Sequence, residues 1–203
     1  MINTFDKEAI KEFIISSDTN LMLALGVMST EKVIRHHIIN NFLRKLEARI
    51  SSQLKSAQFT NEWEILINTR NPDNRFNNFF QLINKNWGDD YSIMIEPQQG
   101  SANQLCYGIK SKHKTGFTEQ GKKIHQIISA HIDMYGLDNT KITEWWPYSP
   151  FVAKEFRDWE NLEVLSLLID NQNTKALDYF SEKIMALVKI IEQDLGEIMQ
   201  NNT

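Results

Sequence analysis

The apolar residues of this chain change their spacing twice, from the 3.6-residue period of a helix to the two-residue period of a strand and back. A long helical pattern begins at Thr30, where a hydroxyl precedes an acidic first turn, and it runs to about Ser56. Alternation replaces it in three short runs, at 63–67, 91–95 and 105–109. The sequence therefore predicts an α+β fold, with a small antiparallel sheet flanked by a long N-terminal helix and a C-terminal helical hairpin.

The positions of Pro, Gly and Asn predict where the loops and the other helices of the chain lie. The linker 97–103 joins the last two alternating runs as an antiparallel hairpin. The Asn-rich stretch 71–90 predicts a loop with a short helix around 76–83. Further helices are expected at 6–16, 118–135, 162–169 and from about 174. We expect one domain over 1–203, made of a helical segment (1–57), strands plus a helix (58–135), an aromatic loop (136–160) and a helical hairpin (161–203).

The aromatic loop holds three of the five tryptophans, and Pro147 and Pro150 exclude a helix there. Ordering a loop costs conformational entropy, so a loop this aromatic must pack onto the body of the protein or onto a partner. Two interpretations stay open: a structural loop that closes the core, or an aromatic recognition surface. The residues concerned are Trp145, Trp146, Tyr148, Phe156, Arg157 and Trp159.

Bulk properties exclude several classes of protein. The net charge of −4 argues against a binder that coats its whole surface with nucleic acid. The single cysteine, Cys106, can form neither an internal disulfide nor a cysteine-based zinc site. No apolar run is long enough to cross a bilayer, and the N-terminus lacks the features of a signal peptide. We expect a cytoplasmic protein with no membrane partner.

A basic segment stands out in this acidic chain. It contains Lys110, Lys112, Lys114, Lys122 and Lys123, with Glu119 as the only acid between them. Alternate lysines at a strand end can follow a phosphate backbone, so weak DNA binding is one expectation. The alternative is an edge strand charged to resist pairing with other chains.

The sequence offers no recognisable catalytic constellation. The eight glycines are scattered rather than gathered in a phosphate-binding loop, and no serine-nucleophile motif occurs. His36 and His37 are adjacent on the long helix and therefore point in different directions, which suits metal chelation poorly. We predict no catalytic residue, no metal site and no cofactor; the weaker alternative is a metal-dependent enzyme whose site is assembled from scattered carboxylates.

The aromatic loop resembles the C-terminal region of a bacterial group in the PD-(D/E)xK nuclease-like superfamily. The resemblance rests on Trp145-Trp146-Pro147-Tyr148, then Phe156-Arg157-Asp158-Trp159 with a helix opening at Asn161, preceded by a strand that contains Tyr107-Gly108-Ile109. It covers most of this chain, but only the non-catalytic half of such proteins. It implies an accessory module that binds DNA or a protein partner, or that dimerises.

The superfamily's chemistry needs an acidic residue and, further along the chain, an Asp or Glu two positions before a Lys, so that the carboxylates hold Mg²⁺ while the lysine steadies the attacking water. No Asp or Glu of this chain has Lys two positions on; the nearest forms end in Arg, as in Glu155-Phe156-Arg157. We therefore predict no nuclease activity for this chain alone. A second hypothesis is a stand-alone phage or mobile-element protein that binds and inhibits a bacterial defence enzyme.

Overall fold

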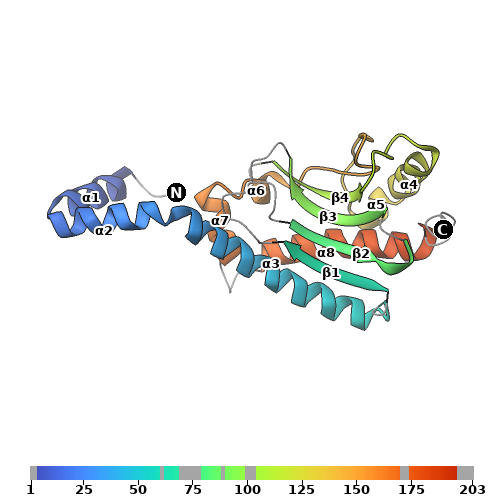
Figure 1. The fold of residues 1–203 in the computed structure, drawn as a ribbon, viewed down its shortest axis with the longest axis horizontal. Helices are drawn as coiled ribbons and strands as arrows, with labels where there is room; N and C mark the ends of the chain where they lie inside the picture. Colours follow the sequence, from blue (N-terminus) through green and yellow to red (C-terminus); the bar gives the residue numbers. More distant parts are fainter. Residues whose placement is uncertain are drawn as a thin grey trace.

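A computed structural model describes residues 4–59, 62–68, 79–87, 90–98, 104–169 and 174–195 of the chain. The fold is α+β, as predicted, with a helical body around one sheet and a pair of helices that extends away from it (Figure 1). The helices are α1 (Thr4–Ile15), α2 (Asp18–Ser29), α3 (Glu31–Ser56), α4 (Glu119–Ala130), α5 (Ile132–Tyr135), α6 (Lys154–Arg157), α7 (Leu162–Ile169) and α8 (Lys175–Ile190). A 3-10 turn, η1 (Lys85–Trp87), and a π-helical turn, η2 (Ile191–Leu195), complete them.

The sheet is an antiparallel meander in the order β1-β2-β3-β4. Its strands are β1 (Trp63–Asn68), β2 (Phe79–Asn84), β3 (Tyr91–Pro97) and β4 (Leu105–Ser111). The three alternating runs of the sequence form β1, β3 and β4, and the predicted hairpin pairs β3 with β4. Residues 99–103 of its linker lie outside the described residues.

The short helix expected around 76–83 is wrong where the structure describes it, because residues from Phe79 onward form β2. Phe80 and Leu82 are buried on one face of the sheet, and β2 pairs with β1 on one side and β3 on the other. Hydrogen bonds to two neighbouring strands determine this conformation. A short apolar run in the sequence does not show which strands it will pair with. Residues 71–78 lie outside the described residues.

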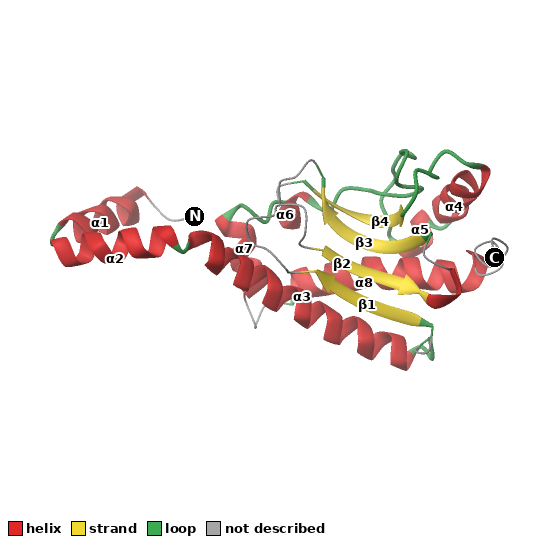
Figure 2. Ribbon diagram, viewed as in Figure 1, coloured by secondary structure: helices red, strands yellow, loops and turns green. Residues whose placement is uncertain are grey.

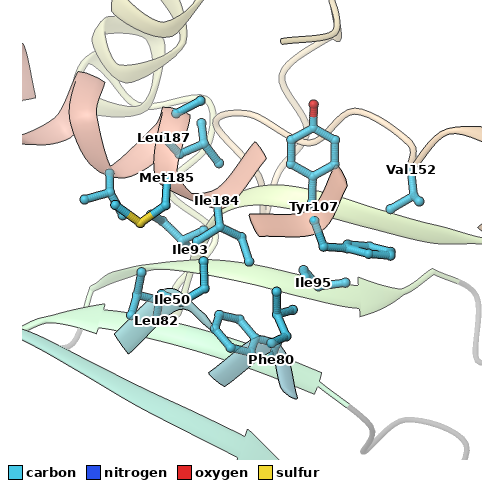
Figure 3. Packing of buried hydrophobic residues seen from close by; sticks show 14 of the residues in the cluster. Ile50, Phe80, Leu82, Ile93, Ile95, Tyr107, Val152, Ile184, Met185 and Leu187 are labelled. Carbon is cyan, nitrogen blue, oxygen red and sulfur yellow. The ribbon is translucent and has the colours of Figure 1, made fainter. Parts of the chain in front are cut away.

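One face of the sheet forms the core with α3 and α8 (Figures 2 and 3). Figure 3 shows Ile50 of α3, Leu82 and Ile93 of the strands and Ile184 of α8 meeting in this layer. All four side chains are fully buried. Burying an aliphatic side chain of this size stabilises the fold by roughly 1.5–3 kcal/mol, so this layer accounts for much of the stability of the body.

Helix α3 belongs to the body only in part. Its apolar positions are buried from Ile39 to Leu54, whereas its first turns continue the direction of α2 away from the body (Figure 1). Arg35 marks the boundary, because its Nη1 donates to the carbonyl oxygens of Trp159 (3.1 Å) and Glu160 (2.6 Å). These bonds fix the direction in which α3 leaves the core.

The helix predicted over 118–135 is divided at His131 into α4 and α5. Thr118 caps α4 by accepting a hydrogen bond from the Gly121 backbone, and Gly136 ends α5 in the left-handed conformation that favours glycine. The final helix likewise ends as α8 at Ile190 and continues as η2. Within the described residues, no helix combines the length and the apolar character needed to cross a membrane.

Candidate functional site

Residues 145–152 of the aromatic loop lie along the outer edge of β4 as an irregular fifth strand. The expectation that the loop contains no helix is wrong, because its residues Lys154–Arg157 form the one-turn helix α6, beyond the two prolines. The backbone amides of Ile109 and Ser111 donate to the carbonyl oxygens of Tyr148 (2.8 Å) and Trp145 (2.8 Å). The Val152 amide donates in return to the carbonyl oxygen of Leu105 (2.9 Å). This edge of the sheet is already covered by the loop. Lys110 on β4 is therefore not needed to prevent the edge from pairing with another chain.

Gly108 permits the close approach of the loop. Its φ is +151°, and a Cβ at this position would lie 1.9 Å from the carbonyl oxygen of Tyr148. A side chain would therefore be strained by the backbone and blocked by the loop at the same time. Glycine in Tyr107-Gly108-Ile109 is required by this contact.

Most of the aromatic loop closes the core. Tyr148, Phe156 and Trp159 are buried in the main hydrophobic cluster, and Trp146 is buried with Met94 and Cys106 in a small cluster of its own. Trp159 packs edge-on against Phe42 and Phe180, with ring centroids 5.9 and 6.0 Å away. Arg157 is tied down as well, since its Nε donates to the carbonyl oxygen of Val152 (2.7 Å). Trp145 differs from these rings, with 40% of its surface exposed.

A polar cluster anchors the loop from below. The Tyr107 hydroxyl donates to Oδ2 of Asp138 (2.8 Å), and the Tyr148 hydroxyl donates to the Asp138 carbonyl oxygen (2.6 Å). Lys183 pairs with the same carboxylate at 3.0 Å. Burial raises the pKa of Tyr107 and of Tyr148, so both phenols stay protonated and act as hydrogen-bond donors. Their arrangement suits anchoring rather than proton abstraction.

The five lysines of the sequence prediction form what we call the basic rim: Lys110, Lys112, Lys114, Lys122 and Lys123. Carboxylate partners are seen in the pairs Lys110–Glu96 (2.6 Å), Lys114–Glu144 (3.1 Å) and Lys122–Glu119 (2.7 Å). Only Glu119 of these acids lies within the basic segment of the sequence. The fold therefore lowers the positive charge of the rim below the value that a count along the chain suggests.

A hollow of about 450 Å³ opens on the face of the sheet opposite the core. Lys110, Lys112 and Trp145 contribute to its lining. In its floor, Gln81 Nε2 donates to Ser92 Oγ (3.1 Å). The remaining lining residues are Ile83, Tyr91, Met94 and Ser111. This hollow thus combines an exposed indole, two cationic side chains and amide and hydroxyl groups, a mixture suited to a side chain or a base of a macromolecule.

The described residues bear on two kinds of chemistry, metal binding and the reactivity of the single thiol. They contain no cluster of three or more His, Cys, Asp or Glu side chains placed to hold a metal ion. Burial raises the pKa of the Cys106 thiol to about 12, which keeps it neutral and unreactive near neutral pH.

No protein-family model, curated protein or solved structure significantly matches this chain. The resemblance to the nuclease-like superfamily therefore stays a prediction, carried by the residues of the aromatic loop and of β4.

Sequence reasoning missed a different surface, which we call the arm: residues 4–34, comprising α1, α2 and the start of α3. The arm projects from the body in Figure 1, and none of the side chains of α2 is buried. Eleven large apolar side chains of the arm are 42–71% exposed. They are Ile10, Phe13, Ile15, Leu21, Met22, Leu23, Leu25, Val27, Met28, Val33 and Ile34. The apolar run Leu21–Met28 was the available signal, but a run alone does not show what covers it.

Proposed function

We propose that this chain is a non-catalytic binding module that docks to another protein through the arm. The exposed apolar surface of the arm is the observation that carries this proposal. Its side chains offer roughly 1,000 Å² of apolar area, whereas monomeric proteins seldom expose a contiguous patch of more than a few hundred Å². Such a surface is typical of a protein interface.

The stability of the arm supports the same conclusion. Helices α1 and α2 are 12 residues long each, a length at which an isolated helix is marginal in water. Among the side chains of the two helices whose burial the structure describes, those of Ile14, Asn20 and Ala24 are half-buried and the others are exposed. Tertiary packing supplies most helical stability in proteins. The arm therefore needs a further packing surface.

The body gives the arm a fixed base. The bonds of Arg35 to Trp159 and Glu160 connect the start of α3 to the end of the aromatic loop, which is itself packed on the core. An accessory module of a nuclease-like protein, as the resemblance implies, would use the arm to join its partner. A phage or mobile-element inhibitor would use it to hold a bacterial defence enzyme. The identity of the bound protein distinguishes these two roles.

Photo-crosslinking in the source cells tests the proposal. A benzophenone amino acid replaces Leu23 on α2 or, as a matched control, Met134 on α5, which is 74% exposed on the body. We expect a discrete protein adduct from position 23 and none from position 134. A second substitution, Leu25→Glu, should remove that adduct, because it places a charge in the apolar contact. Equal labelling from both positions would overturn the proposal.

A second candidate partner is nucleic acid, bound at the basic rim. One observation favours it: the exposed ring of Trp145 lines the same hollow as Lys110 and Lys112. Exposed aromatic rings beside cationic groups are the usual means of holding unpaired bases without regard to sequence. The ion pairs of the rim weaken this candidate relative to a protein partner.

A further inference from the structure

We infer that the protein docked on the arm is a second copy of this chain, with two α1–α2 hairpins packing into a four-helix bundle. This inference rests on the proposed function and names its partner. Four features of the arm carry it: the apolar character of α2 on all sides, the distribution of charge on α1, the area available, and the geometry of the hairpin.

Helix α2 has no polar face. Its central residues, Leu21 to Met28, are all apolar and follow one another at angles of about 100°, so the six large ones among them are spread around the circumference of the helix. A helix on the surface of a folded body needs only one apolar stripe, whereas a helix that is apolar all round is buried on all sides. The described side chains of α1 leave α2 half-buried at Asn20 and Ala24 and exposed at its other positions. The other sides require more than one additional helix.

Helix α1 supplies the outer surface of such a bundle. Lys7, Glu8, Lys11 and Glu12 give it a mixed charged face, and Lys11 pairs with Glu8 at 3.3 Å. Two hairpins related by a two-fold axis can place both α2 helices in the centre and both charged faces of α1 toward water. Each copy then provides the cover that the other lacks. A single sequence can satisfy this arrangement because the interface is self-complementary.

The available area matches what a stable dimer needs. The roughly 1,000 Å² of exposed apolar surface per chain is close to the ~800 Å² that each partner contributes to a standard interface. The hairpin is also a built unit rather than two loose helices. Ser17 Oγ caps α2 by accepting from the Asn20 amide, and the Asn20 side chain donates to the carbonyl oxygen of Phe13 at 2.9 Å.

A lipid bilayer fits the arm less well. The 12 residues of α2 span about 18 Å, well short of the ~30 Å hydrocarbon core. A helix lying in the membrane surface carries a polar face rich in Lys and Arg, whereas α2 has no polar face and α1 mixes both signs of charge. Protein helices are therefore the better cover.

The test measures the molar mass of the purified full-length chain by light scattering over a range of concentrations. We expect two copies per particle at micromolar concentration. Leu23→Glu should weaken the dimer by roughly a hundredfold or more, because the charge would be buried without a partner. Met134→Glu, at a similarly exposed apolar position on the body, should leave the dimer unchanged. Circular dichroism of Leu23→Glu should show that the body keeps its thermal transition.

Several outcomes would overturn the inference. A single-chain mass up to about 100 μM, well above the usual range for stable homodimers, would exclude the second copy. A dimer unaffected by Leu23→Glu would place the interface elsewhere, and binding of a monomer to neutral phosphatidylcholine vesicles would favour a membrane. A position-23 crosslink to a different protein would overturn the second copy and leave the proposed function standing. No crosslink above the control would overturn both.

Discussion

Helices α3 and α2 are both rich in apolar residues, but the structure treats them in opposite ways. Helix α3 buries six apolar side chains between Ile39 and Leu54, while α2 buries none. The difference lies in their polar residues: α3 interleaves charged and amide side chains with its apolar positions, whereas α2 has none between Leu21 and Met28. An amphipathic helix needs one core, and its own chain can provide it. A helix without a polar face needs cover that the described part of the body does not supply.

The largest effect should come from removing a buried aromatic side chain of the aromatic loop from the core. Trp159→Ala removes a fully buried ring that packs against Phe42 and Phe180, and we expect a loss of roughly 3–5 kcal/mol in the free energy of unfolding. Trp146→Ala, in the smaller outer cluster, should fall at or below the lower end of that range. Chemical denaturation measures both. Shifts in melting temperature of a degree or less for both would show that the rings are exposed in solution.

Leu23→Ala on the arm provides the contrast. In the monomer, this substitution should change the free energy of unfolding by less than about 0.5 kcal/mol, because Leu23 is 65% exposed. A large loss in the monomer would show that the arm folds back on the body, and the contrast between the two regions would then disappear.

The second effect concerns the contact between the aromatic loop and β4. Gly108→Ala should cost about 2–4 kcal/mol, since it adds backbone strain at positive φ to a collision with the loop. Gly136→Ala is the matched control: its φ is also positive, but a Cβ there meets nothing within 4 Å. We expect the control to lose only the strain, about 1–2 kcal/mol. Equal losses would mean that the loop yields without cost.

The sequence predicted the regular parts of this fold well where the apolar period was clear. The alternating runs gave β1, β3 and β4, and the helical spacing from Thr30 gave α3. It failed at β2, because pairing with two distant strands determined the conformation of Phe79–Asn84. Local periodicity records which residues share a face. It does not record which segment covers that face.

The candidate site shows the same limit. The composition of the aromatic loop required it to pack, but only the fold shows that Trp159 enters the core while Trp145 stays exposed. Along the chain, Glu119 was the only acid expected beside the lysines of the rim, whereas the further partners Glu96 and Glu144 come from β3 and from the aromatic loop. The net charge of a surface depends on residues that only the fold brings together. Counting charges within one segment of the sequence therefore overestimates the positive charge of the rim.

A smaller effect tests how tightly η2 closes the far end of the sheet. Burial raises the pKa of the Glu192 carboxyl, against the hydrogen bond that Trp63 Nε1 donates to it at 2.6 Å. Because the folded-state pKa is raised, the folded protein holds this proton more tightly, and stability falls as pH rises through the folded pKa. Glu192→Gln keeps an acceptor for Trp63 and removes the buried charge. The variant should therefore melt slightly higher at pH 7, and this gain should shrink as the pH falls through the raised folded-state pKa and be absent below about pH 4.5, the ordinary pKa of glutamate.

Thermal melts of both proteins between acid and neutral pH measure this difference. A variant that melts lower at pH 7 would show that the charged hydrogen bond to Trp63 outweighs the cost of burial. Glu192 is half-buried, so solvent screening keeps the expected shift small.

The smallest effect on stability should come from substitutions in the basic rim. The same substitutions test whether the body of the protein also binds a partner. Replacing Lys112, Lys114 and Lys122 with Glu should change the free energy of unfolding by under about 1 kcal/mol, since exposed ion pairs contribute little. Wild-type protein should bind DNA weakly and without sequence preference, with a dissociation constant no tighter than the roughly 10⁻⁴–10⁻⁶ M of such contacts. The triple variant should lose this binding.

The salt dependence of DNA binding tests more directly whether the basic rim makes the contacts. Phosphate contacts release condensed counterions, so binding by the rim must weaken steeply as salt rises. The carboxylate partners of Lys114 and Lys122 compete with phosphate, which predicts a shallower slope than five independent lysines would give. Trp145→Ala should weaken binding to single strands more than to duplex, because only unpaired bases can stack on its ring. No salt-dependent binding to either form at low salt would leave the arm as the binding surface that the structure supports.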